Sequence, residues 1–134
     1  MTIRYLADTS AIGRLQQGKA ATRWKRAVTA GMIAICDPVE LEILRWVPGG
    51  ARRRSMQRVL RQSYPWCSVP DDVWRRAIEL QDQLGDHGLH NGASVVDLLV
   101  AATAERHRLT VLHDDADYEV ISRVTGLPVQ RITD

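Results

Sequence analysis

The stretch SVVDLLVAATAERHRLTVLHDDADYEVI, residues 94–121, carries most of the information about the fold. Its first part, residues 94–107, is the most apolar segment of the chain and predicts a helix that lies against a sheet. The next part, LTVLH at 109–113, is typical of a short buried strand. The acidic turn that follows predicts a short helix ending at Gly126. A buried helix followed by a buried strand and a second helix favours a parallel sheet.

The rest of the chain shows the same alternation of short apolar runs and helical patterns. Strands are expected at residues 3–7, 32–36, 66–69 and 127–132. Helices are expected from residue 8 and at 20–30, 37–46, 51–62 and 71–84, with a glycine-rich loop at 85–92. This order predicts an α/β fold with helices on both faces of a parallel sheet, in a single domain spanning residues 1–134.

Composition excludes several classes of protein. With 45% hydrophobic and 25% charged residues the chain is expected to be globular rather than disordered. We expect no membrane partner, because no apolar run approaches the length of a membrane span. The N-terminus lacks the pattern of a secretory signal. Cys36 and Cys67 stand alone in apolar surroundings, as buried thiols of a reducing compartment do, which favours a cytoplasmic location.

Basic residues are unevenly distributed. Sixteen of the 18 are arginines, and residues 43–70 hold six arginines and no acid. In the helix expected at 51–62, helical spacing puts Met56, Val59 and Leu60 inward and Arg54, Arg58 and Arg61 outward. This excess of positive charge indicates a polyanionic partner such as RNA, with a solvated helix face as the alternative.

Acidic residues follow the expected strands. Asp8 comes directly after the first strand, Glu40 and Glu42 lie in the helix after the second, Asp97 begins the apolar helix, and Asp114, Asp115 and Asp117 follow the strand at 109–113. Each acid alone could simply cap a helix, as Asp8, Asp114 and the Ser94–Asp97 pair would. Together they are expected at the carboxyl edge of one sheet, where ligands bind. Carboxylates that close together favour a hard divalent cation, Mg²⁺ or Mn²⁺, which can activate water against a phosphodiester.

Glu40 and Glu42 cannot both face such a site. Two residues apart on a helix, they point about 200° away from each other. The apolar residues around them leave the choice open.

Four motifs in this order resemble those of the PIN-domain ribonucleases, specifically the VapC toxins of bacterial toxin–antitoxin pairs. They are DTSAI at 8–12, PVELEIL at 38–44, SVVDLLVAATAERH at 94–107 and TVLHDDADYEVI at 110–121. The resemblance covers nearly the whole chain. It implies a three-layer α/β/α sandwich around a parallel sheet, and a Mg²⁺- or Mn²⁺-dependent endoribonuclease that cleaves transfer or ribosomal RNA. It further implies a homodimer and a small VapB antitoxin that silences the enzyme.

The resemblance also implies roles for single residues. Asp8, Asp97 and Asp115 would hold the metal ion, with Asp117 as their companion. Glu42 would match the family's glutamate better than Glu40 does. Ser10 would support the acids through its hydroxyl. Asp114 would then only cap its helix, and Glu119 would face solvent. Two residues depart from the family pattern T-x-D-x-D-F: His113 stands for the threonine and Tyr118 for the phenylalanine.

Other classes of function fit the sequence less well. His87 and His90 form H-x-x-H, but neither cysteine has the paired spacing of a zinc site. A phosphoacceptor receiver domain would need a late lysine, and the last lysine is Lys25. A haloacid-dehalogenase-like phosphatase would have an acid where Ser10 stands. The remaining alternative is a PIN-like module that binds RNA or protein without catalysis, although such modules typically lose acids that this chain retains.

Overall fold

The computed structural model describes residues 2–134, and within them four strands form one parallel sheet. The strands are β1 (Tyr5–Ala7), β2 (Ile33–Ala34), β3 (Thr110–His113) and β4 (Val129–Arg131), in the order β2-β1-β3-β4. Tyr5 of β1 pairs with Ile33 on one side and with Thr110 on the other. The predicted parallel sheet is therefore confirmed, with β1 and β3 at its centre.

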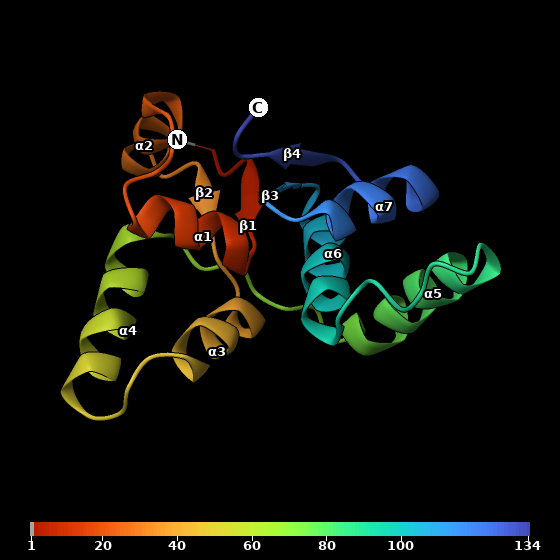
Figure 1. The fold of residues 1–134 in the computed structure, drawn as a ribbon, viewed down its shortest axis with the longest axis horizontal. Helices are drawn as coiled ribbons and strands as arrows, with labels where there is room; N and C mark the ends of the chain where they lie inside the picture. The colour runs from red at the N-terminus through yellow and green to blue at the C-terminus, as the bar shows by residue number, and fades with distance from the viewer. Residues whose placement is uncertain (1) are drawn as a thin grey trace.

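Seven helices surround this sheet in the described part of the chain. They are α1 (Thr9–Gln16), α2 (Thr22–Thr29), α3 (Asp37–Arg45), α4 (Ala51–Ser63), α5 (Val73–Asp86), α6 (Val95–His107) and α7 (Ala116–Thr125). Each predicted helix is present, and Pro38 lies in the first turn of α3 as expected. Figure 1 shows α4 and α5 at opposite ends of the molecule with α3 between them.

The connections between strands decide which face each helix covers. From β1 the chain crosses to β2 through α1 and α2, and later reaches β3, on the opposite side of β1, through α6. Right-handed crossovers in opposite directions place these helices on opposite faces of the sheet. Both α1 and α6 contact β1 and β3. The result is the expected three-layer α/β/α sandwich.

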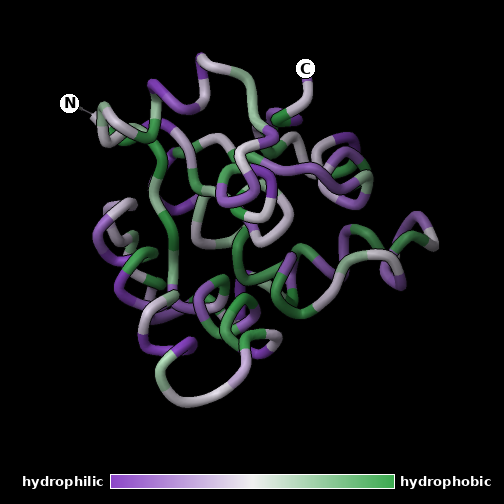
Figure 2. The backbone as a smooth tube through the Cα atoms, turned by 60° about the vertical axis from the view of Figure 1, so that its left-hand side comes forward, coloured by the Kyte–Doolittle hydropathy of each residue, from purple (hydrophilic) through white to green (hydrophobic). Residues whose placement is uncertain are grey.

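The burial of α6 explains its composition. The helix packs against the sheet and also against α3 and α5, so Leu98 to Ala102 are all buried. A helix enclosed on all sides must be apolar all round. The outer helices differ, because hydrophobic and hydrophilic residues alternate along them in Figure 2, as expected for helices that bury one face.

Two local predictions are wrong. Residues 66–69 do not form a strand: Trp66 makes one isolated bridge to Ile35, because the chain there leaves the sheet edge after a single pair. Val59 was expected inward on α4 but is 38% exposed, since α4 buries only the narrow face centred on Leu60. Cys36 and Cys67 are both buried and free, as predicted.

Among residues 2–134, no helix combines the length and the apolar character that a membrane crossing requires.

Candidate active site

Asp8 and Ser10 connect the ends of the two central strands. Asp8 follows β1 directly, is 4% exposed, and accepts a hydrogen bond from the Ala11 amide at 3.0 Å as the N-cap of α1. The Ser10 hydroxyl donates to the Asp8 carboxylate at 2.7 Å and accepts from the Asp114 amide at 2.8 Å. Ser10 therefore ties the end of β1 to the residue that follows β3.

Asp97 is placed by the start of α6. Ser94 and Asp97 form a capping box, in which the Ser94 amide donates to Asp97 Oδ2 at 3.0 Å and the Asp97 amide donates to the Ser94 hydroxyl at 3.1 Å. The residue is 9% exposed. The Asp97 side chain can therefore cap α6 and also belong to a cluster of acids.

The cap of α7 is Asp115, so the expectation that Asp114 caps this helix is wrong. The Asp115 carboxylate accepts from the Asp117 amide at 2.9 Å. Asp114 instead forms ion pairs with Arg14 at 2.8 Å and Arg131 at 3.7 Å, because it lies one residue before the helix can be capped. Glu119 is exposed, as expected, and pairs with Arg131.

Three carboxylates come together at this edge. Oxygen atoms of Asp97, Asp115 and Asp117 lie within 4.8 Å of one another. Burial raises the pKa of Asp97 and of Asp117, and the charge of Asp115 raises both further. Such a cluster suits a hard cation, because a cation removes the repulsion that otherwise favours protonation.

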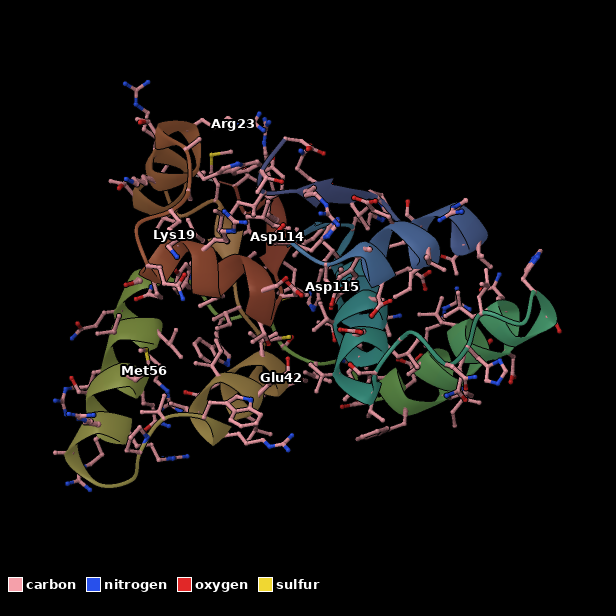
Figure 3. All side chains as sticks on the ribbon, viewed as in Figure 1. Lys19, Arg23, Glu42, Met56, Asp114 and Asp115 are labelled. Atoms are coloured by element: carbon pink, nitrogen blue, oxygen red, sulfur yellow. The ribbon has the colours of Figure 1, made fainter. Side chains whose placement is uncertain are left out.

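Asp8 stands beside this group of three rather than inside it. Burial raises the pKa of Asp8 to about 7, against the hydrogen bonds from Ala11 and Ser10, and the charge of Asp97 adds to the increase. We call Asp8, Asp97, Asp115 and Asp117 the acidic site. Asp8 follows β1, Asp97 lies in the first turn of α6, and Asp115 and Asp117 lie at the start of α7. Figure 3 shows Asp115 where α1, α6 and α7 approach one another.

The two glutamates of α3 have different partners. Glu42 accepts a hydrogen bond from the hydroxyl of Thr9, the residue next to Asp8. Glu40 is 7% exposed and binds Arg61 of α4 through two hydrogen bonds of 3.1 and 3.3 Å. Thus Glu42 faces the start of α1, next to the acidic site, and Glu40 faces α4.

The arginines of α4 are not equivalent either. Arg54 and Arg58 are exposed, and no ion pair engages them within the described residues. The guanidinium of Arg61 is held by Glu40 and lies 5.8 Å from the centre of the Trp66 ring. Helical spacing alone puts Arg61 in one group with Arg54 and Arg58. The structure distinguishes it from them, because its charge is already balanced by Glu40.

Two cavities border the site. One of about 480 Å³ is lined by Glu42 and Arg45 and by apolar side chains that include Leu41 and Trp74, which are 68% and 61% exposed. A second of about 270 Å³ adjoins Asp117 and is walled by the loop before α6 and by α7. The first cavity therefore adjoins Glu42, and the second adjoins a member of the acidic site.

Sequence reasoning missed Thr9 and Arg14. Thr9 lies inside the DTSAI motif, but nothing in the motif indicates that its hydroxyl meets Glu42 33 residues later. Arg14 had a usable signal: it stands four residues after Ser10 on α1, so both side chains share one face, and both contact Asp114.

Comparison with known proteins places the chain in a family. The model of the PIN domain family matches residues 5–124. Two curated relatives from Mycobacterium tuberculosis, Ribonuclease VapC21 and Ribonuclease VapC2, are each 35% identical to the chain. The alignments cover 97% of this chain and 94% and 93% of those proteins.

Solved structures show the same fold at lower identity. VapBC2 from Rickettsia felis, bound to a DNA fragment from its promoter, superposes with a TM-score of 0.76 at 17% identity, and covers 98% of each chain. DNA-bound VapBC from Salmonella typhimurium reaches 0.78 at 13% identity, over 96% of this chain and 98% of that one. The chain belongs to the PIN domain family, as one of its VapC members.

The pKa of Asp8 predicts how stability depends on pH. Because this pKa is about 7 in the folded chain and 3.8 for an ordinary aspartate side chain, the native state binds the proton more tightly than the unfolded state. The free energy of unfolding of the metal-free protein should therefore fall by up to about 4 kcal/mol as pH rises from about 4 to 7. Urea denaturation across this range measures the slope. Asp8→Asn should flatten it, whereas Asp71→Asn, at an exposed position, should leave it unchanged; equal slopes in all three proteins would contradict the prediction.

Proposed function

We propose that this chain is an endoribonuclease toxin whose acidic site holds Mg²⁺ or Mn²⁺ and cleaves RNA, and that a VapB-type antitoxin neutralises it. The observation that carries the proposal is the convergence of Asp8, Asp97, Asp115 and Asp117 in a PIN-domain chain whose close relatives are named ribonucleases. On this proposal residues 1–134 act as one catalytic domain in the cytoplasm.

The residues of the site would share the work as follows. Asp97, Asp115 and Asp117 hold the ion together with Asp8, and Ser10 keeps Asp8 in place through its hydrogen bond. A bound ion would supply Lewis-acid chemistry, which polarises a phosphate and makes water more acidic. Glu42, held by Thr9, would orient a water molecule for in-line attack on the phosphorus, with the ribose oxygen of the cleaved bond as the leaving group. No side chain is required as a nucleophile.

RNA would reach the site across the basic surface of α4. This helix carries the exposed arginines Arg54 and Arg58 in a stretch of the chain without acids. Guanidinium groups suit phosphate oxygens, and single-stranded loops of transfer or ribosomal RNA expose them. On this proposal the substrate extends from the acidic site past α3 toward α4.

The antitoxin would bind beside the same site. Several chains of similar fold come from VapBC complexes. In this chain the cavity next to Glu42 has apolar walls with Leu41 and Trp74 at its surface, and Arg45 gives it a charged edge. A peptide segment of the antitoxin with apolar and acidic residues would fit there and exclude RNA. We also expect a homodimer, as the family resemblance implies.

Loss of one metal-binding carboxylate should abolish cleavage. We predict that Asp97→Asn lowers the rate of RNA cleavage by at least about a hundredfold, since the site loses a negative charge that binds the ion. Excess EDTA should stop the wild-type enzyme, and added Mg²⁺ or Mn²⁺ should restore it. The assay follows cleavage of a labelled RNA, with Asp71→Asn as the control. Full activity in Asp97→Asn, or in EDTA, would rule out the proposed mechanism and indicate cleavage without a metal ion, whereas a wild-type protein that binds RNA without cleaving it would favour a non-catalytic binding module.

The two glutamates should separate into one that affects catalysis and one that affects stability. Glu42→Gln should lower kcat by about ten- to a hundredfold with little change in the free energy of unfolding, because Glu42 faces the site. Glu40→Gln should lower the free energy of unfolding, because it removes the charge that pairs with Arg61, and should leave kcat near the wild-type value. The reverse result would assign the catalytic position to Glu40.

The arginines of α4 should determine part of the salt dependence of RNA binding. Replacing Arg54 and Arg58 together by glutamine should reduce the slope of log K against log salt by about 1.4, given about 0.7 per phosphate contact on single-stranded RNA. Binding is measured with inactive Asp97→Asn protein at several salt concentrations. The matched control, Lys25→Gln with Arg26→Gln on exposed positions of α2, removes the same charge elsewhere. If both pairs lower the slope equally, α4 is not a specific RNA surface.

A further inference from the structure

The glycine-rich loop at 85–92 borders the acidic site, although the proposed function gives the loop no role. It forms one wall of the cavity of about 270 Å³, with Gly88, Leu89 and Gly92 among the lining residues. Residues of α7, among them Asp117, form another wall. The loop and a carboxylate of the acidic site therefore line the same small space.

Gly92 packs directly against the Asp117 carboxylate. A β-carbon at position 92 would lie 3.1 Å from Asp117 Oδ1 and 3.8 Å from its Cγ. The first distance is shorter than ordinary van der Waals contact, for which carbon atoms lie about 3.5–4.0 Å apart. A side chain at position 92 would therefore displace this carboxylate by a few tenths of an ångström.

Space, rather than backbone conformation, favours glycine at position 92. The glycines with positive φ angles, which other residues rarely adopt, are Gly18, Gly31, Gly50, Gly88 and Gly126. Among the others, Gly13 and Gly49 have no atom within 4 Å of a β-carbon position, and Gly85 has only ordinary contacts. Within residues 2–134, Gly92 is thus the one glycine whose missing side chain makes room for an acid.

Asp117 depends on such packing more than the other acids do. The carboxylates of Asp8 and Asp97 each accept a hydrogen bond from a backbone amide at 3.0 Å. Asp117 donates its own amide to Asp115, but no described residue donates a hydrogen bond to its carboxylate or forms an ion pair with it. The contact with Gly92 therefore limits the directions open to this carboxylate.

The position of this carboxylate matters because the ion of the proposed function has a strict geometry. Mg²⁺ requires a nearly regular octahedron of ligands at about 2.0–2.1 Å. Oxygen atoms of Asp97, Asp115 and Asp117 lie within 4.8 Å of one another, close enough to share one ion. A shift of one carboxylate by a few tenths of an ångström is large against that tolerance.

We propose that Gly92 is a positioning residue of the acidic site: because it has no side chain, the loop backbone packs against the Asp117 carboxylate and sets its place for binding the divalent ion. Gly92 touches neither the ion nor RNA and acts only through Asp117. The inference rests on the part of the proposed function that assigns a metal ion to the acidic site.

Gly92→Ala adds a single methyl group and tests the proposal. Mn²⁺ binding is measured by calorimetry on the RNA-free protein at pH 7.5. The expected Kd is about tenfold higher than in the wild type, as for other changes that misplace a metal ligand. The electron paramagnetic resonance spectrum of Mn²⁺ at saturation, which reports the symmetry of its ligands, should change as well. The unfolding midpoint of the metal-free protein should not fall, because alanine tolerates this backbone conformation.

Gly49→Ala is the matched control. Gly49 also lies at an exposed turn position without a positive φ, and a β-carbon there would meet no atom within 4 Å. The same chemical change should leave the Kd and the spectrum of Mn²⁺ unaltered. In an Asp117→Ala background, Gly92→Ala should have less than about a twofold further effect on the Kd, because the carboxylate that it displaces is gone.

An unchanged Kd in Gly92→Ala overturns the proposal, as does an equal loss in Gly49→Ala. An undiminished effect in the Asp117→Ala background, or a lower unfolding midpoint of Gly92→Ala, also overturns it, because Gly92 would then act on the fold rather than through Asp117. A wild-type protein that binds Mn²⁺ but cleaves no RNA would refute the ribonuclease function and leave the role of Gly92 intact. A wild-type protein that binds no Mn²⁺ would refute both.

Discussion

Repulsion among carboxylates at one edge of the sheet is the constraint on which the rest of the structure depends. Asp8, Asp97, Asp115 and Asp117 are brought together although each raises the free energy of ionising its neighbours. The fold offsets this cost with helix N-termini, because Asp8, Asp97 and Asp115 each cap or begin a helix whose amides face the negative charge. A divalent cation in the proposed enzyme would complete the compensation.

Around this site, ionic contacts separate the acids that serve the fold from those available to a ligand. Asp114 is neutralised by Arg14 and Arg131, and Glu40 by Arg61. Within residues 2–134, Glu42 accepts a hydrogen bond from a hydroxyl and forms no ion pair with an arginine. The arginines of this chain therefore have two uses: some hold structural acids in place, while Arg54 and Arg58 remain exposed for the proposed contact with RNA.

Pattern reasoning worked where a residue's surroundings are local or periodic. The apolar helix at 94–107, the strand before the acidic turn and the edge on which the acids gather followed from hydrophobic period and the rule for parallel sheets. It failed where a side chain had more than one available direction. The pattern predicts Val59 inward, but it is exposed. It predicts a strand at 66–69, where one bridge forms, and a cap at Asp114, whereas Asp115 is the cap.

The sequence by itself determined the α/β order, the parallel sheet and the set of acids from which a metal site could be built, because these depend on residue type and spacing along the chain. Only the tertiary structure decided which side chain each of these acids contacts. Glu40 and Glu42 are equivalent in pattern, and their separation depends on Arg61 and Thr9, which lie 21 and 33 residues away. The burial of Tyr118 also had no local signal, since it results from packing α7 against α5 and β4.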